Sequence, residues 1–178
     1  MVLLVGLDLS LRETGLATCD DKQASSLRVI SVSPPKNMRG ASRLSWYNNY
    51  FTCLFRSALK TDKKVYVCLE GYAMGVSASK SRSFDIGELG GIVKMVLFNN
   101  NIPYVIVPPT CLKKFISGKG NAPKDIIIKE VYKKYSFDTN NNNHADAFAL
   151  LKICECYFLN KYPELAYQKD VLKDLCVS

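Results

Sequence analysis

Three carboxylates in this sequence stand where apolar segments end or begin. Asp8 follows the run VLLVGL, Glu70 ends KVYVCLE, and Asp146 lies between two alanines at the start of an apolar stretch. Buried carboxylates are costly and repel one another unless a cation accompanies them. Three carboxylates brought together would suit a divalent metal ion, and acidic oxygen ligands are typical of Mg²⁺ and Mn²⁺ sites.

Each carboxylate also has a purely structural explanation. Asp8 could be a turn aspartate, Glu70 a surface residue at a strand end, and Asp146 an N-terminal helix residue favoured by the helix dipole. The occurrence of all three carboxylates in such positions favours a shared metal site. Strands that end in Asp8 and Glu70 deliver the two side by side if they are adjacent and parallel, and the alanines would let the Asp146 helix approach closely.

The spacing of apolar residues predicts the elements that would position these side chains. We expect buried strands over 2–8 and 64–70, an antiparallel meander continuing through 14–19 and 27–32, and a short strand over 104–108. We expect helices from about 44 to 58, 84 to 99, 124 to 135 and 144 to 159, the last capped by the asparagine tract 140–143. Loops are expected over 33–42, 71–83 and 117–125, and the paired Gly90 and Gly91 suggest close backbone packing. This order predicts an α/β fold with a mixed sheet.

Length and composition narrow the function classes. The 178 residues suit one domain, expected over 1–160, with 161–178 as a peripheral tail. The net charge of +8 favours a nucleic-acid partner over a membrane, since no basic amphipathic helix stands out, although a merely basic protein is the alternative. The seven cysteines form no CxxC pair, which predicts reduced thiols and a cytoplasmic location. The apolar run at the N-terminus is too short for a signal peptide or a membrane span.

Four segments in order resemble the motifs of the RuvC group of ribonuclease H-like nucleases. They are VGLDLSLRETGLA, VCLEGY, ISGKGNAPKD and NNHADAFALL, and together they cover residues 3 to about 155. The resemblance implies a ribonuclease H-like fold with a five-stranded mixed sheet flanked by helices. It further implies a homodimer that resolves four-way (Holliday) DNA junctions in recombination and repair, possibly phage-encoded and then located in the host cytoplasm. We consider the helix around Gly90 and Gly91 the candidate dimer contact, with packing on its own sheet as the alternative.

The resemblance also implies a catalytic site. Two Mg²⁺ or Mn²⁺ ions about 4 Å apart would activate water and stabilise the leaving oxygen, with Asp8 bridging them and Glu70 and Asp146 as further ligands. Many relatives have an aspartate three residues before the last one, where this chain has Asn143, followed by His144. Helical spacing favours Asn143 as the fourth ligand, whereas an unwound helix start would favour His144; a helix-capping role is the alternative for both.

Basic residues near these motifs are candidate contacts to DNA phosphates, which confer affinity and salt dependence rather than sequence choice. The candidates are Lys80, Arg82, Lys113, Lys114, Lys119 and Lys124. For any single lysine, a solvated surface position is the alternative. Relatives stack an aromatic residue on unpaired bases shortly after the catalytic glutamate, and Tyr72 or Met74 could take this role here.

Other functions remain to be weighed against a resolvase. A broader nuclease for flap, Y or three-way DNA, or a ribonuclease H, would use the same metal site. An inactive junction-binding protein is the non-enzyme alternative, and the retention of all three carboxylates argues against it. The sugar kinase and actin-like ATPase group requires two such domains, which 178 residues cannot hold.

Overall fold

The computed structural model describes residues 1–71, 80–161, 163 and 165–177, with only the backbone considered for 80–85. The strands are β1 (Val2–Asp8), β2 (Thr14–Asp20), β3 (Gln23–Val32), β4 (Lys64–Glu70) and β5 (Tyr104–Val107). The helices are α1 (Gly40–Leu59), α2 (Lys80–Asn99), α3 (Pro109–Ser117), α4 (Lys124–Tyr135), α5 (Asn142–Phe158) and α6 (Ala166–Lys173).

The five strands form one mixed sheet in the order β3-β2-β1-β4-β5. The first three strands are an antiparallel meander, and β4 and β5 add to β1 in parallel. The predicted α/β class with a five-stranded mixed sheet is confirmed. Because β1 and β4 are parallel neighbours, their carboxyl ends lie at the same edge of the sheet. This is the arrangement that the sequence hypothesis needed in order to bring Asp8 and Glu70 together.

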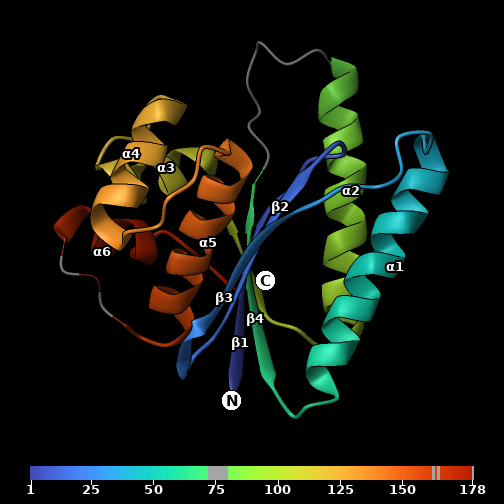
Figure 1. The fold of residues 1–178 in the computed structure, drawn as a ribbon, viewed down its shortest axis with the longest axis horizontal. Coiled ribbons are helices and arrows are strands. Elements are labelled where there is room, and N and C mark those ends of the chain that lie inside the picture. The colour runs from blue at the N-terminus through green and yellow to red at the C-terminus, as the bar shows by residue number, and fades with distance from the viewer. Residues whose placement is uncertain (72–79, 162, 164, 178) are drawn as a thin grey trace.

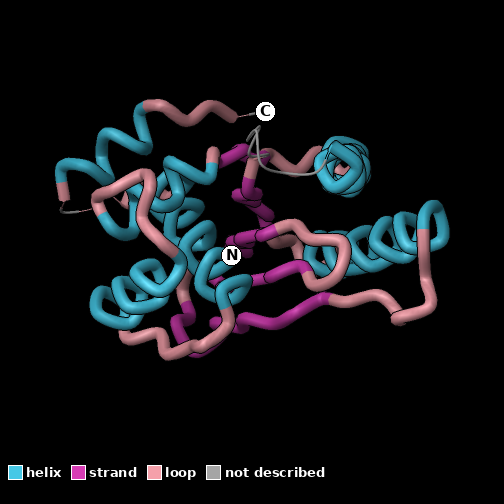
Figure 2. The backbone as a smooth tube through the Cα atoms, turned by 90° about the horizontal axis from the view of Figure 1, so that it is seen from above, coloured by secondary structure: helices cyan, strands magenta, loops and turns pink. Residues whose placement is uncertain are grey.

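Helices cover both faces of the sheet, with α1 and α2 on one side and α3 to α6 on the other (Figures 1 and 2). Strand residues alternate between the two resulting cores. Val5 and Leu7 of β1 join the core under α1 and α2, whereas Leu4 joins the core under α5. Helix α5 runs along β1 and β2 at short range, since a Cβ atom built on Gly6 would lie 2.2 Å from the carbonyl oxygen of Ala147.

Several element boundaries differ from the sequence predictions. Helix α2 begins at Lys80 rather than near residue 84, and α1 begins at Gly40, inside the expected loop. Helix α3 was not predicted, although a proline in its first turn and the left-handed Gly118 at its C-terminus are common helix-boundary signals. Its nine residues allow barely two turns, too few for a clear apolar period.

The segment expected to be a peripheral tail contains α6 and contributes to the core. Val171 and Leu175 are buried in the cluster under α5, and Val177 forms a bridge with Val105 of the edge strand β5. The sequence of this segment mixes polar and apolar residues without a clear period, and α6 packs against α3 and α5.

All seven cysteines are free thiols, in line with the predicted reduced state. Close packing was also expected at Gly91, but a Cβ atom built there meets nothing within 4 Å. Among the described residues, none of the helices is both long enough and apolar enough to cross a lipid bilayer.

Candidate active site

Asp8 and Glu70 project from the sheet toward the side of α5. Asp8 lies two residues after Gly6 and four after Leu4 on β1, so these residues share one face of the sheet. Glu70 lies two residues after Cys68 on β4 and shares a face with it. Leu4 and Cys68 both belong to the core under α5, so the two carboxylates share that face. Their side chains are joined by a hydrogen bond. The expected pairing of the two strand-end carboxylates is therefore present.

Helix α5 brings the third carboxylate to the same edge because glycine lies beneath its first turn. Asp8 is paired across the sheet with Gly15 of β2. A Cβ atom built on Gly15 would lie 2.2 Å from the carbonyl oxygen of Asn143 and 3.1 Å from Cβ of Ala147. The alanines beside Asp146 were expected to allow a close approach of the helix. This approach also needs Gly15 on the sheet, which the helix sequence alone could not reveal.

Burial raises the pKa values of all three carboxylates, and repulsion by neighbouring carboxylates raises those of Glu70 and Asp146 further. Burial is the largest cause at each residue, and the Asp8 charge also raises the pKa of Glu70, to about 9, and that of Asp146, to about 6. The hydrogen bond from Glu70 and the charge of Lys124 partly offset the effect of burial at Asp8. Without a cation, Glu70 is therefore a neutral acid at pH 7, bonded to the Asp8 carboxylate.

Two of the predicted DNA-binding lysines lie close enough to act on these carboxylates. The charge of Lys124, at the start of α4, lowers the pKa values of Asp8, Glu70 and Asp146, and that of Lys113, on α3, lowers that of Asp146. Helices α3 and α4, on either side of the Gly-rich segment, thus bring positive charge to the carboxylates.

The other predicted DNA contacts are less closely tied to the site. Lys119 is exposed in the turn before α4. Lys114 follows Lys113 directly on α3, and successive residues of a helix are turned by about 100°, so the two side chains leave the helix in different directions. Lys80 and Arg82, which were expected in a loop, belong to the first turn of α2. Tyr72 and Met74 lie outside the described residues.

The donor set fits a divalent cation in its chemistry. Three neighbouring carboxylates, of which Glu70 is protonated because of its burial and the nearby negative charges, are groups that a divalent ion would bind and neutralise. In the part of the chain that the structure describes, no three His, Cys, Asp or Glu side chains form a ready-made ligand cluster as they lie. The three carboxylates are thus suited to a divalent cation by their chemistry rather than by a preformed arrangement.

Asn143 and His144 make hydrogen bonds on the side of α5 that faces β2 and β3. The amide nitrogen of Asn143 donates to the backbone carbonyl of Glu13 at 3.0 Å, and Nε2 of His144 lies 2.9 Å from Oγ of Ser31. Asn141, whose Oδ1 accepts from the backbone N–H groups of Asn143 and His144, is the N-cap of the helix. The bond of Asn143 uses its nitrogen and leaves the chemistry of its oxygen available to a cation.

The turn after Asp8 is held by residues that the sequence predictions did not single out. Thr14 is fully buried, and its Oγ1 donates to the carbonyl of Ser10 at 2.8 Å and accepts from the Ser10 N–H at 3.2 Å. The hydroxyl of Tyr47 on α1 donates to the same carbonyl at 2.9 Å. These bonds fix the turn that contains Leu9 and Ser10.

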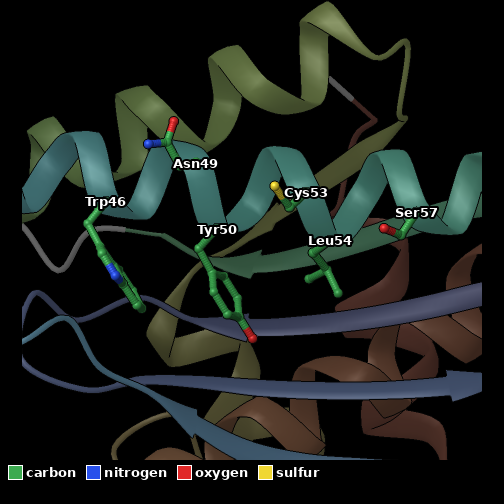
Figure 3. Close-up of a pocket in the computed structure, with 6 residues that line it drawn as sticks. All are labelled: Trp46, Asn49, Tyr50, Cys53, Leu54 and Ser57. Carbon is green, nitrogen blue, oxygen red and sulfur yellow. The ribbon is translucent and has the colours of Figure 1, made fainter.

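A hollow of about 510 Å³ lies away from the carboxylates. It is formed on α1 and is lined by Trp46, Asn49, Tyr50, Cys53, Leu54 and Ser57 (Figure 3). Trp46 and Tyr50 stack with ring centroids 5.4 Å apart, and both pack on the core of the opposite sheet face. The carboxylates lie elsewhere, at the carboxyl ends of β1 and β4 and in the first turns of α5.

Comparison with solved structures shows which known proteins share this fold. The chain is similar to Thermus thermophilus RuvC, with a TM-score of 0.65 and 15% identity over 89% of this chain and 97% of that one. It is similar to T. thermophilus RuvC in complex with a Holliday junction substrate, with a TM-score of 0.62 and 17% identity over 85% and 91% of the two chains. It is also similar to Ydc2, the yeast mitochondrial Holliday junction resolvase, with a TM-score of 0.51 and 11% identity over 95% and 79%. No protein-family model matches the sequence. The resemblance found in the four motifs is thus confirmed at the level of the fold, which is that of the RuvC-like resolvases.

Proposed function

We propose that this protein is a metal-dependent endonuclease that resolves four-way DNA junctions. The observation that carries the proposal is that Asp8, Glu70 and Asp146, from two adjacent parallel strands and a crossing helix, interact at one edge of the sheet in a RuvC-like fold. Two of the solved structures of this fold are described as a Holliday junction resolvase and as a complex with a junction substrate.

Asp8, Glu70 and Asp146 would hold the metal, with Oδ1 of Asn143 as the fourth ligand. His144 is the weaker candidate because its Nε2 is engaged by Ser31. When bound, Mg²⁺ or Mn²⁺ supplies the activation of water and the stabilisation of the leaving oxygen in phosphodiester hydrolysis. The proton on Glu70 would be displaced on metal binding, since a nearby cation favours the charged carboxylate.

Lys113 and Lys124 would bind the phosphate that enters the site. Their charges already act on the carboxylates, so each can contact a phosphate oxygen held at the same edge. Lys119, exposed in the neighbouring turn, would contact the backbone of an arm of the junction.

A homodimer would supply two equivalent sites for the two equivalent strands of a junction. Met95 and Phe98 on α2 support this assembly, since their side chains are 61% and 76% exposed and lie on one face of the helix. A Phe98→Asp variant should lower the molar mass measured by light scattering toward that of one chain. A parental protein that is monomeric at micromolar concentration would contradict the dimer.

The decisive experiment compares purified protein on four-way, three-way, flap, duplex and RNA–DNA substrates with Mg²⁺ or Mn²⁺. We expect the four-way junction to be cut fastest, and Asp8→Asn and Asp146→Asn to abolish cleavage while leaving junction binding intact. Preference for a duplex or for an RNA–DNA hybrid would overturn the proposed substrate. Cleavage by either variant at the parental rate would overturn the proposed site.

A further inference from the structure

A hydrogen-bonded network joins the first turn of α5 to the two strands beside it. Asn141 Nδ2 donates to Oε1 of Glu13 at 2.9 Å, and Oγ of Ser31 donates to the same oxygen at 2.5 Å. The Ser31 oxygen also lies 2.9 Å from Nε2 of His144, and Asn143 Nδ2 donates to the Glu13 backbone carbonyl at 3.0 Å. Glu13 is therefore the centre of the network, through both its side chain and its backbone.

The direction of each bond follows from the groups involved. A serine hydroxyl has one hydrogen, and the Glu13 carboxylate takes it, so the Ser31 oxygen accepts from the Nε2–H of His144. The bonds from Ser31 and Asn141 hold the pKa of Glu13 below its usual value, which keeps its carboxylate charged. Bonds to a charged acceptor are shorter and stronger than neutral ones.

The network acts along one row of residues that crosses the sheet. Ser31 of β3 pairs with Gly15 of β2, and Gly15 pairs with Asp8 of β1. The first turn of α5 lies on Gly15, with His144 bonded to Ser31 at one end of the row. At the other end, the charges of Asp146 and Asp8 interact. A shift of the helix along this row changes the separation between the two aspartates.

We propose that Glu13 is a positioning residue: through Asn141, Ser31 and His144 it fixes the first turn of α5 and so sets Asp146 against Asp8. This inference rests on the proposed metal-dependent cleavage, since it assigns Glu13 a role in preparing that site. Glu13 is only partly buried and touches none of the three carboxylates through the bonds described. Its contribution to overall stability should therefore be small compared with its effect on the site.

The test compares Glu13→Ala, Glu13→Gln and Ser31→Ala with the parental protein. Asp170→Ala, which removes an exposed carboxylate paired only locally with Lys173, is the control. Three quantities are measured: the single-turnover cleavage rate at saturating Mn²⁺, junction affinity with Ca²⁺, and the Mn²⁺ concentration that half-maximally raises the melting temperature without DNA.

We expect Glu13→Ala to lower the cleavage rate by about 10-fold to 100-fold, the loss typical of an ångström-scale misplacement. The Mn²⁺ midpoint should rise by about tenfold, as when a residue that orients metal ligands is removed. Junction affinity should stay near the parental value. Glu13→Gln should recover most of both losses, because its amide oxygen still accepts from Ser31 and Asn141.

A Glu13→Ala variant with the parental rate and Mn²⁺ midpoint would overturn the inference and leave the proposed function standing. If Glu13→Ala fails to fold, Ser31→Ala decides, since it removes the link to His144 and retains Glu13: losses in rate and midpoint support the inference, and parental values overturn it. If the parental protein cuts no branched DNA, the proposed function fails, and the Mn²⁺ midpoints without DNA still decide on the role of Glu13.

Discussion

Adding one methyl group at Gly15 should separate folding from catalysis in this protein. Gly15 lies on β2 beneath the first turn of α5, and a Cβ atom there would lie 2.2 Å from the carbonyl oxygen of Asn143 and 2.8 Å from its carbonyl carbon. Both atoms belong to the helix backbone, so no side-chain rotation can relieve the contact. Ordinary van der Waals contact begins at 3.4 Å. A Gly15→Ala variant must therefore move α5 away from the sheet by about 1 Å.

That displacement has two consequences of different size. Overpacking of this kind typically costs about 1–3 kcal/mol in the free energy of unfolding, which a domain of this size can survive. Asp146 lies one helical turn beyond Asn143 and moves with it, away from Asp8. A misplacement of about 1 Å can cost on the order of 100-fold in rate. We expect a folded protein that binds junctions and cuts them about 100 times more slowly.

The assay combines single-turnover cleavage of a four-way junction with urea denaturation of the same preparations. Gly87→Ala is the steric control, because a Cβ atom built on Gly87 meets nothing within 4 Å. Its stability should be unchanged or should rise by up to about 1 kcal/mol, as for an alanine replacing a helical glycine. A Gly15→Ala protein with parental stability and rate would refute the close approach of α5 to β2.

Three further predictions concern charge at the carboxylate edge. In metal-free protein the pKa of Glu70 is raised from 4.5 to about 9, so the unfolded chain loses this proton at a lower pH than the folded protein does. The free energy of unfolding should therefore fall as the pH rises between these two values. In urea titrations, Glu70→Gln should flatten this pH dependence. Lys113→Ala and Lys124→Ala should each reduce the slope of log affinity against log salt by about 1, measured by fluorescence anisotropy, whereas an unchanged slope would mean that neither lysine contacts a phosphate. Asn143→Ala should lower the cleavage rate more than His144→Ala does, and parental rates in both variants would argue against a fourth ligand at either position.

Much of the site could be predicted from the sequence because its signals are local. An apolar run that ends in a carboxylate identifies a buried strand whose last residue reaches the sheet edge, and this holds for both Asp8 and Glu70. The small residues around Asp146 indicated a helix built for close packing. The parallel pairing of β1 with β4 was a condition of the sequence hypothesis, and the structure meets it.

The sequence predictions missed features that depend on partners distant along the chain. The short helices α3 and α6 become recognisable as core elements only through the surfaces they cover together with α5. Glu13 and Ser31 had no visible role, because the residues they bind, Asn141 and His144, lie more than 100 positions away. No local pattern could have indicated that Asn143 and His144 would bond toward the meander.

The sequence by itself thus determined which groups reach the edge of the sheet, since hydrophobic periodicity and chain direction are properties of neighbouring residues. Only the tertiary structure decided how closely they meet. That distance is set by Gly15 under the first turn of α5, and the protonation of Glu70 is set by burial beside Asp8. Contact and electrostatic energies depend on separations in space, which the order of residues along the chain does not specify.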